Sequence, residues 1–273
     1  MIYLIDIKLV QNRLAFDIVL IKTVIQYIRS VFKYFLPLLF LCLICCNTSN
    51  EPLLIATAAN MQAPMQELMA KFEETRKIDC ELSVASSGKL ATQIKNGAPF
   101  DVFVSADTVY PGQLFSENLI VNNPQVYGYG MLCLCDTEVN EGLAFTYEHL
   151  SMANKIAVAN PDIAPYGKAA VEALEKVYPD YRDKLLYGES IGQTALFVRS
   201  GAATLGILSK SMKQAIEEKG GKCVSIKTSL YNPIAQAVGV IKGSKQQKAA
   251  LEFQKFLLSN QGKEILDKFG YSQ

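Results

Sequence analysis

Short apolar runs alternate with longer segments whose apolar residues recur at helical spacing, from Leu53 to the end of the chain. The first such run, Leu53–Thr57, is followed by a helical pattern over Met61–Glu74. This alternation is typical of α/β layering, with a largely parallel sheet between helices. The sequence therefore predicts an α/β fold.

The same patterns predict the remaining elements. Further strands are expected at Glu81–Ala85, Asp101–Val104, Met131–Cys135, Ile156–Val158, Leu205–Leu208 and Ile234–Ile241. Further helices are expected at Lys89–Lys95, Lys168–Tyr178, Gly192–Arg199, Gln246–Ser259 and Gly262–Lys268. Each predicted strand is short and each helix has one apolar stripe, as expected for elements of a layered domain.

Two segments rich in Gly, Tyr or Pro, residues 127–130 and 231–233, are candidate crossovers between lobes. The block between them predicts a second lobe, residues 129–234, inserted into a first lobe made of residues 47–128 and 235–273. Two lobes joined by two strands form a hinge, and the cleft between such lobes is a common site for small molecules.

The N-terminal part predicts an export signal. Residues 34–46 are an uncharged apolar run preceded by Lys22, Arg29 and Lys33. The run is shorter than the roughly 20 residues that a spanning helix needs, and a basic flank before a short apolar core is the secretory pattern. Its end resembles a bacterial lipobox, so residues 1–46 are predicted to be a signal peptide with Cys46 lipidated and holding the protein at a membrane. An uncleaved signal anchor, and a translation start downstream of Met1, are alternatives.

The charge balance argues against nucleic acid as a partner. The chain has 27 Lys and Arg against 26 Asp and Glu, and without residues 1–45 the balance is 22 against 24. Nucleic-acid binding needs a clustered basic face. Any anion site must therefore depend on local dipoles.

Motifs for catalysis are missing from the sequence. The single histidine, His149, has no nucleophile motif beside it and makes a zinc site or a hydrolase triad improbable. No phosphate-binding loop or dinucleotide fingerprint occurs. We expect neither an enzyme nor a bound cofactor.

Four cysteines follow Cys46 in the chain: Cys80, Cys133, Cys135 and Cys223. Cys133 and Cys135 are two residues apart in an apolar run, so on a strand both would point to one face as packed thiols. A disulfide between Cys80 and Cys223 stays open.

Four predicted helix starts look alike and carry the functional argument. They lie at Asn60, at Ser86-Ser87-Gly88, at Tyr166-Gly167 and at Ser190-Ile191, each after a strand or the loop that follows it. A helix start leaves backbone N–H groups free and carries about half a positive charge. Taken singly, each is explained by an ordinary cap, turn or packing contact. Together, two from each lobe, they predict a cleft that binds a dianion through neutral donors.

Several motifs appear in the order of a known family. They are Ala58-Ala59-Asn60, Ala85-Ser86-Ser87-Gly88-Lys89-Leu90, the string Gly-Ala-Pro-Phe-Asp-Val-Phe-Val-Ser-Ala-Asp over residues 97–107, the Ala-Asn-Pro and Ala-Pro-Tyr-Gly block over 159–167, and Gly206-Ile207. From about Leu53 to Tyr271 the chain resembles the periplasmic molybdate-binding proteins of ABC transporters. The resemblance implies a type II periplasmic-binding-protein fold, two α/β lobes joined by a two-strand hinge, which closes on molybdate or tungstate and delivers it to a permease. A monomer is expected.

The resemblance also assigns site residues. Ala59 would contribute its backbone, Asn60 and Ser87 their side chains, and Tyr166 and Ile191 mainly their main-chain N–H groups. Some members have a tyrosine where Ser209 stands, so a contact from Ser209 stays open. Asp107 would repel an anion and is interpreted as structural. Sulfate or phosphate is the alternative ligand, and the sequence does not separate molybdate from tungstate.

Overall fold

The computed structural model describes residue 22 and residues 24–30, 51–137 and 142–272. The chain forms two units, Met1–Asn50 and Glu51–Gln273. In the first unit, Lys22 and residues 24–30 are helical. The predicted apolar run and Cys46 lie outside the described residues. Within the described part, no helix has the length and apolar character that crossing a membrane requires.

Lobe 1 is built on a five-stranded sheet that contains the first and the last strand of the second unit. Its strands, in spatial order, are β2 (Cys80–Ala85), β1 (Leu53–Ala58), β3 (Val102–Val104), β10 (Ile234–Val240) and β4 (Gln125–Gly130). Helices α2 (Gln62–Arg76), α9 (Gln247–Leu257) and α10 (Asn260–Lys268) contact one another and cover one core cluster. Helices α3 (Ser87–Lys95) and α4 (Val109–Ser116) cover a second cluster.

The two core clusters of lobe 1 follow from alternation along β1. Leu53 and Ile55 pack with Phe72 and Phe253, whereas Ala56 packs with Leu90, in the cluster of α3 and α4. Successive side chains of a strand point to opposite faces, so a nearly continuous apolar strand is buried on both sides.

Lobe 2 has a second five-stranded sheet. Its strands, in spatial order, are β7 (Leu185–Gly188), β6 (Ile156–Ala159), β8 (Leu205–Ser209), β5 (Leu132–Asp136) and β9 (Lys222–Ser225). Its helices are α5 (Tyr147–Met152), α6 (Pro165–Val177), α7 (Ile191–Arg199) and α8 (Lys213–Glu217). Ile156 and Val158 pack in the cluster that includes α6, whereas Ala157 packs against Val198 of α7, so the two long helices lie on opposite faces of the sheet.

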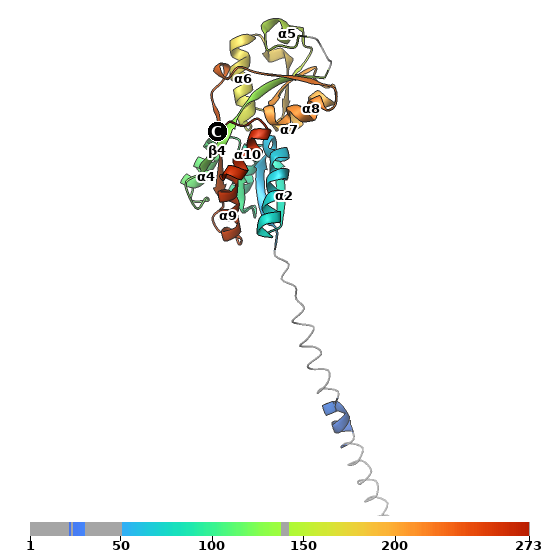
Figure 1. The fold of residues 1–273 in the computed structure, drawn as a ribbon, viewed down its shortest axis with the longest axis vertical. Helices are drawn as coiled ribbons and strands as arrows, with labels where there is room; N and C mark the ends of the chain where they lie inside the picture. The colour runs from blue at the N-terminus through green and yellow to red at the C-terminus, as the bar shows by residue number, and fades with distance from the viewer. Residues whose placement is uncertain (1–21, 23, 31–50, 138–141, 273) are drawn as a thin grey trace, which may run out of the picture. The chain divides into compact units, whose positions relative to one another are not determined.

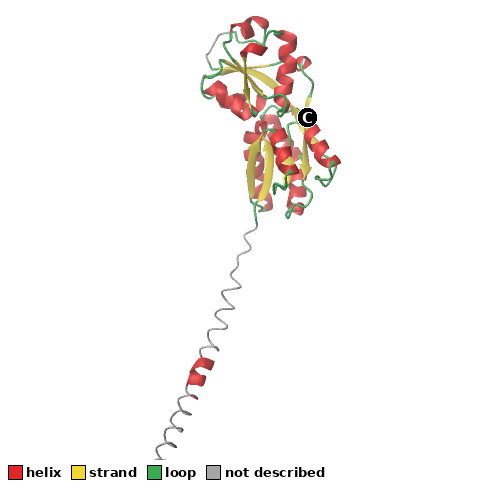
Figure 2. Cartoon of the chain, turned by 180° about the vertical axis from the view of Figure 1, so that it is seen from behind, coloured by secondary structure: helices red, strands yellow, loops and turns green. Residues whose placement is uncertain are grey.

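The chain crosses between the sheets twice, once between β4 and β5 and once between η4 (Thr228–Leu230) and β10. Figure 1 shows the consequence: the lobe of α2, α9 and α10 joins the blue and red parts of the chain, while the other lobe is yellow-green to orange. The two sheets are distinct in Figure 2. This two-lobed α/β architecture agrees with the predicted fold class.

The prediction of largely parallel sheets is wrong in one respect. Each sheet has two parallel and two antiparallel pairings. The antiparallel pairs involve β10 in lobe 1 and β5 in lobe 2, the two strands that follow the crossovers. The glycine-rich crossover at residues 127–130 is itself part of strand β4, because residues there still pair with β10.

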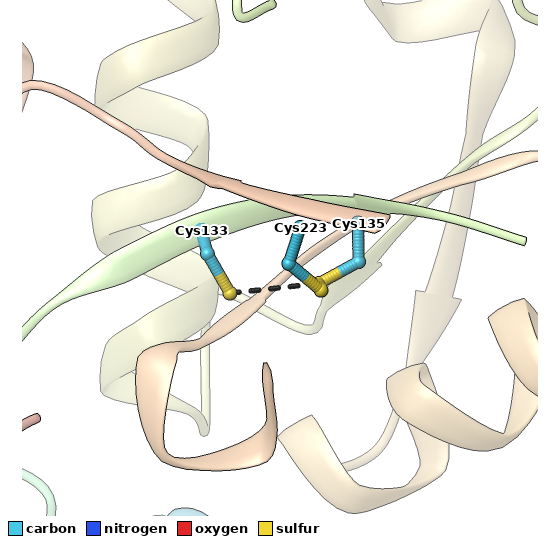
Figure 3. A group of neighbouring side chains, drawn as sticks. All are labelled: Cys133, Cys135 and Cys223. Carbon is cyan, nitrogen blue, oxygen red and sulfur yellow. Dashed lines mark hydrogen bonds between the residues drawn. A yellow bond between two sulfur atoms is a disulfide. The ribbon is translucent and has the colours of Figure 1, made fainter. Parts of the chain in front are cut away.

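The expectation for Cys135 is also corrected. Cys135 is not a free thiol but forms a disulfide with Cys223, which lies directly opposite it on β9 (Figure 3). Cys133, on the same face of β5, is a free buried thiol 3.6 Å from the sulfur of Cys135, and burial raises its pKa to about 12. Cys80 is free on β2 of lobe 1, so it does not pair with Cys223. The short strand β9 was not predicted. Without β9, nothing in the sequence places Cys223 opposite Cys135.

Candidate functional site

Each predicted helix start is a helix or 3₁₀ start in the structure. The 3₁₀ turn η1 covers Ala59–Met61, directly after β1. Helix α3 begins at Ser87, α6 at Pro165 and α7 at Ile191, each after an extended N-cap residue. The main-chain N–H groups of Ser87, Tyr166 and Ile191, in the first turns, have no intrahelical acceptor. They are the donors that helix geometry leaves for a ligand.

These starts meet at one small cavity between the lobes. All five residues predicted for the site line it, and the complete lining is Ala58, Ala59, Asn60, Ser86, Ser87, Ala106, Ala164, Pro165, Tyr166 and Ile191. Most of these residues are buried, including Asn60, Ser86, Ser87, Tyr166 and Ile191. The structure therefore brings the predicted residues together, and their contact with a ligand stays a prediction.

Direct contacts across the cleft close the lobes around the cavity. The N–H of Gly88 donates to the carbonyl oxygen of Ile163 over 3.0 Å, from α3 of lobe 1 to the loop before α6 of lobe 2. The Tyr110 hydroxyl donates to the carbonyl oxygen of Asp162 over 3.1 Å, and Lys89 forms an ion pair with Glu189. A Cβ at position 88 would lie 2.7 Å from the Tyr110 hydroxyl and only 3.0 Å from the Ile163 carbonyl oxygen of lobe 2. Glycine is thus what lets α3 approach lobe 2.

The two serines before α3 offer different hydroxyl groups. Ser87 Oγ accepts the N–H of Ala106 over 3.0 Å, which occupies a lone pair and leaves the hydroxyl hydrogen free to donate. Ser86 Oγ is buried and has no hydrogen-bond partner among the described residues. A buried polar atom without a partner costs free energy, about 1–3 kcal/mol. Both hydroxyls lie where a ligand's oxygens could satisfy them.

Ser86 is a residue that the prediction of site residues left out. Ala58, Ala106, Ala164 and Pro165 were also not named, and all five line the cavity. In the sequence Ser86 is explained by an ordinary helix cap, since an N-cap serine normally accepts a helix N–H. Its side chain makes no such capping bond, and that can be read only from the structure.

Asn60 belongs to a buried polar network beneath the cavity. Its side-chain amide lies 2.9 Å from the side-chain amide of Gln236 and 2.8 Å from the Tyr271 hydroxyl. The other end of Gln236 lies 2.8 Å from the Tyr166 hydroxyl of lobe 2. The network joins the hinge strand β10 to both lobes. A side chain at Gly130 would collide with Tyr166 and Gln236, so a glycine in the hinge makes room for it.

The phenols in this network are neutral donors. Burial raises the pKa of Tyr127 and Tyr166 well above the ordinary value and that of Tyr271 to about 12. The hydroxyls keep their hydrogens at neutral pH, so no phenolate charge faces the cavity. Ser209, whose contact was left open, is buried beside Ser211, with 2.7 Å between the two hydroxyl oxygens. Ser209 is not among the lining residues.

The charges of the lining residues also favour this cavity, and not the neighbouring depression, as the site of an anion. None of the described residues that line it carries a formal charge. A larger depression outside it is lined by Asp107, Asp162 and Glu172, with Lys168 as the one basic residue in its lining. Burial raises the pKa of Asp107, and its carboxylate accepts the N–H of Tyr110 in the first turn of α4. Asp107 is therefore structural, and its depression is unsuited to an anion.

No metal-ligating arrangement lies at this cavity among the described residues. The sulfurs of Cys133, Cys135 and Cys223 lie within 4.8 Å of one another in lobe 2, but the disulfide takes two of them (Figure 3). The absence of a cofactor stays a prediction.

A two-lobed α/β fold with an interlobe cavity lined by uncharged residues is typical of a solute-binding protein. Residues 53–272 match the family model described as bacterial extracellular solute-binding protein. The chain belongs to this family.

Individual proteins similar to this chain are more specific than the family model. The chain is 34% identical to the molybdate-binding protein ModA of Rhodobacter capsulatus over 79% of this chain and 86% of the relative. The solved periplasmic molybdate-binding protein of Azotobacter vinelandii superposes with a TM-score of 0.75 at 27% identity, covering 81% of this chain and 99% of the other. A putative ABC transporter substrate-binding lipoprotein of Bacillus subtilis, YvgL, is 26% identical over 81% of this chain and 86% of its own.

Proposed function

We propose that this protein captures molybdate, and also tungstate, outside the cytoplasm and delivers it to an ABC permease. The observation that carries the proposal is the cavity itself: starts of four helical segments, two from each lobe, meet at one small space without a charged side chain. Helix N-termini favour anions through free N–H groups and the helix dipole. The similarity to the molybdate-binding proteins of Rhodobacter and Azotobacter supports the choice of ligand.

In this proposal each lobe contributes a set of hydrogen bonds to the oxygens of the anion. Lobe 1 donates from the backbone at Ala59, the side chain of Asn60 and the hydroxyl of Ser87. Lobe 2 donates the main-chain N–H groups of Tyr166 and Ile191. A buried dianion needs its oxygens fully hydrogen-bonded, and hydrogen bonds to a charged group contribute about 1.5–3 kcal/mol each.

Selection follows from closure. The contacts between Gly88 and Ile163 and between Tyr110 and Asp162 hold the walls of the cavity at a fixed separation. A smaller tetrahedral anion such as sulfate or phosphate could not reach all donors at once. Molybdate and tungstate, nearly equal in size, would both fit.

The remaining expectations belong to the same proposal. The protein acts without catalysis, as a monomer, and is tethered through a lipid on Cys46, for which the lipoprotein relative YvgL offers support. Mass spectrometry of the native N-terminus would detect the lipid; an unmodified mature N-terminus would end this part of the proposal.

The test of ligand identity is titration calorimetry of residues 47–273 with molybdate, tungstate, sulfate and phosphate. We expect tight, saturable binding of the first two and far weaker binding of the others. Ligand binding also raises the melting temperature by mass action, so thermal unfolding gives an independent readout. Equal affinity for all four anions, or preference for sulfate or phosphate, would contradict the proposal.

A further inference from the structure

We propose that Gln236, which lies outside the cavity lining, is a positioning residue that turns the amide nitrogen of Asn60 toward the ligand and so makes the site donor-only. The inference rests on the proposed function, because it specifies how the same cavity distinguishes oxyanions. Its basis is a count of hydrogens in the buried network that joins Asn60, Gln236, Tyr127 and Tyr271.

The oxygen and nitrogen of a carboxamide are nearly alike in size, so hydrogen-bond partners decide which end is which. With Nδ2 of Asn60 directed at Gln236 Oε1 and at the Tyr271 hydroxyl, two problems arise. Asn60 Oδ1 is buried without a partner among the described residues. In addition, the Tyr127 hydroxyl would have to donate to two oxygens, the Ser105 carbonyl at 2.9 Å and Gln236 Oε1 at 2.7 Å.

A phenol has one hydrogen, so Tyr127 cannot make both bonds. Turning the carboxamide of Gln236 by half a turn resolves this conflict. Tyr127 then donates to Ser105 and accepts from Gln236 Nε2, while Gln236 Oε1 accepts from the Tyr166 hydroxyl at the 2.8 Å contact. The second hydrogen of Gln236 Nε2 is directed at Asn60.

Asn60 must then present its oxygen to Gln236. In this orientation Oδ1 accepts from Gln236 Nε2 and from the Tyr271 hydroxyl, over the same 2.9 and 2.8 Å contacts. The single hydrogen of Tyr271, which in the other orientation donates to the main-chain carbonyl oxygen of Asn60 over 3.3 Å, then goes to Oδ1. Every hydrogen on these four side chains has an acceptor except those of one group. That group is Asn60 Nδ2. It now occupies the end of the Asn60 side chain that has no hydrogen-bond partner among the described residues. Asn60 itself lines the cavity.

The consequence is chemical selectivity. A donor at this position suits an oxyanion without hydrogens, such as molybdate, whereas an acceptor there would suit one that carries a hydrogen, such as hydrogen phosphate. The choice is made by Gln236 and Tyr127, neither of which lines the cavity. The Ser105 carbonyl, which takes the hydrogen of Tyr127, is the group that fixes the direction of the chain of hydrogen bonds.

The first experiment is Gln236→Glu, studied by calorimetry with molybdate and with hydrogen phosphate at a pH well above the second pKa of phosphate, where both anions are dianions. A carboxylate only accepts, so it would draw Asn60 Nδ2 back and turn Oδ1 to the ligand. We expect molybdate affinity to fall at least about tenfold, the size of one charge-assisted hydrogen bond. Charge repulsion alone would weaken both dianions equally, so the phosphate-to-molybdate affinity ratio must rise. An unchanged ratio would overturn the inference.

A double-mutant cycle tests whether Gln236 acts through Asn60. In an Asn60→Ala background, the change in affinity ratio caused by Gln236→Glu should disappear. Gln254→Glu is the matched control, since Gln254 is also buried in lobe 1 but bonds only to the Val238 carbonyl among the described residues. We expect this control to leave the ratio at the wild-type value. Persistence of the Gln236 effect without Asn60 would overturn the inference.

A second measurement needs no variant and guards against misfolding of Gln236→Glu. Neutron diffraction from deuterium-exchanged crystals of the wild-type protein with molybdate would locate the hydrogens. Deuterium on the cavity end of Asn60 and on the Asn60-facing end of Gln236 is expected; the reverse would overturn the inference. If the wild-type protein fails to bind molybdate at all, the proposed function fails, which is a different outcome.

Discussion

The two lobes face the same cavity with different kinds of donor. In the proposed site, lobe 1 adds side-chain donors, the hydroxyls of Ser86 and Ser87 and the amide of Asn60, to the backbone at Ala59, whereas lobe 2 offers the main-chain N–H groups of Tyr166 and Ile191. A side-chain donor can be lost by one substitution, but a main-chain donor depends on the local fold. Lobe 2 is also the lobe with a disulfide. We therefore expect ligand recognition by lobe 2 to depend on the rigidity of that lobe, and ligand recognition by lobe 1 to depend on residue identity.

The largest expected effect concerns the rigidity of lobe 2. The Cys135–Cys223 disulfide closes a loop with a sequence separation of 88, and Cys223→Ala should lower the free energy of unfolding by about 3–5 kcal/mol. Chemical denaturation of the purified variant measures this. Cys80→Ala is the control, because Cys80 is a free thiol of lobe 1. Equal losses in the two variants would contradict the assigned role of the disulfide.

A main-chain donor of lobe 2 can be removed without removing the helix. Ile191 is the first residue of α7 and Ser190 before it is extended, with φ −150° and ψ 164°, which suits a proline at position 191. Ile191→Pro deletes one N–H, so molybdate affinity should fall by about 1.5–3 kcal/mol in calorimetry. Ile191→Val keeps the N–H and should bind nearly as the wild type. Similar affinities for the two variants would remove this N–H from the site.

The serines of lobe 1 allow a matched pair of substitutions. Ser86→Ala and Ser87→Ala should each weaken molybdate binding by about 1–2 kcal/mol. Without ligand they should differ, because Ser87 Oγ accepts the Ala106 N–H and Ser86 Oγ has no partner among the described residues. We expect only Ser87→Ala to lower the melting temperature of the ligand-free protein. Unchanged affinity in either variant would exclude that hydroxyl from binding.

Much of this arrangement follows from sequence patterns. Strands buried on both faces, such as β1 and β6, are continuous apolar runs, and the small or polar residues after them mark the helix starts. The four starts could be predicted for this reason. Their meeting at one cavity could be expected only from the two-lobed architecture, which the alternation and the two crossovers indicated.

Other features depend on contacts that sequence patterns do not encode. Strand β4 contains two glycines and was interpreted as a crossover, although pairing with β10 makes it a strand. The disulfide needed the register of β5 against the unpredicted β9. In the sequence, Ser86 is explained by an ordinary cap or turn, and Gln236 is one position of a predicted strand. Only the structure shows that Ser86 Oγ is buried without a partner among the described residues, and that Gln236 contacts Asn60, 176 residues away.

The smallest expected effect tests where the lobes touch outside the cavity. Lys89 and Glu189 pair across the cleft with 41% and 68% of their side chains exposed, and such surface pairs contribute about 0–1 kcal/mol. Lys89→Ala should therefore weaken molybdate binding slightly at low salt and not at high salt, because ions screen exposed charges. Lys71→Ala is matched in exposure, at 39%, but its partner Glu74 lies on the same helix of lobe 1. If both variants change molybdate affinity equally, the Lys89 pair takes no part in closure. A salt-sensitive loss of affinity confined to Lys89→Ala would instead show that a side chain of lobe 1 helps to hold the two lobes together outside the cavity.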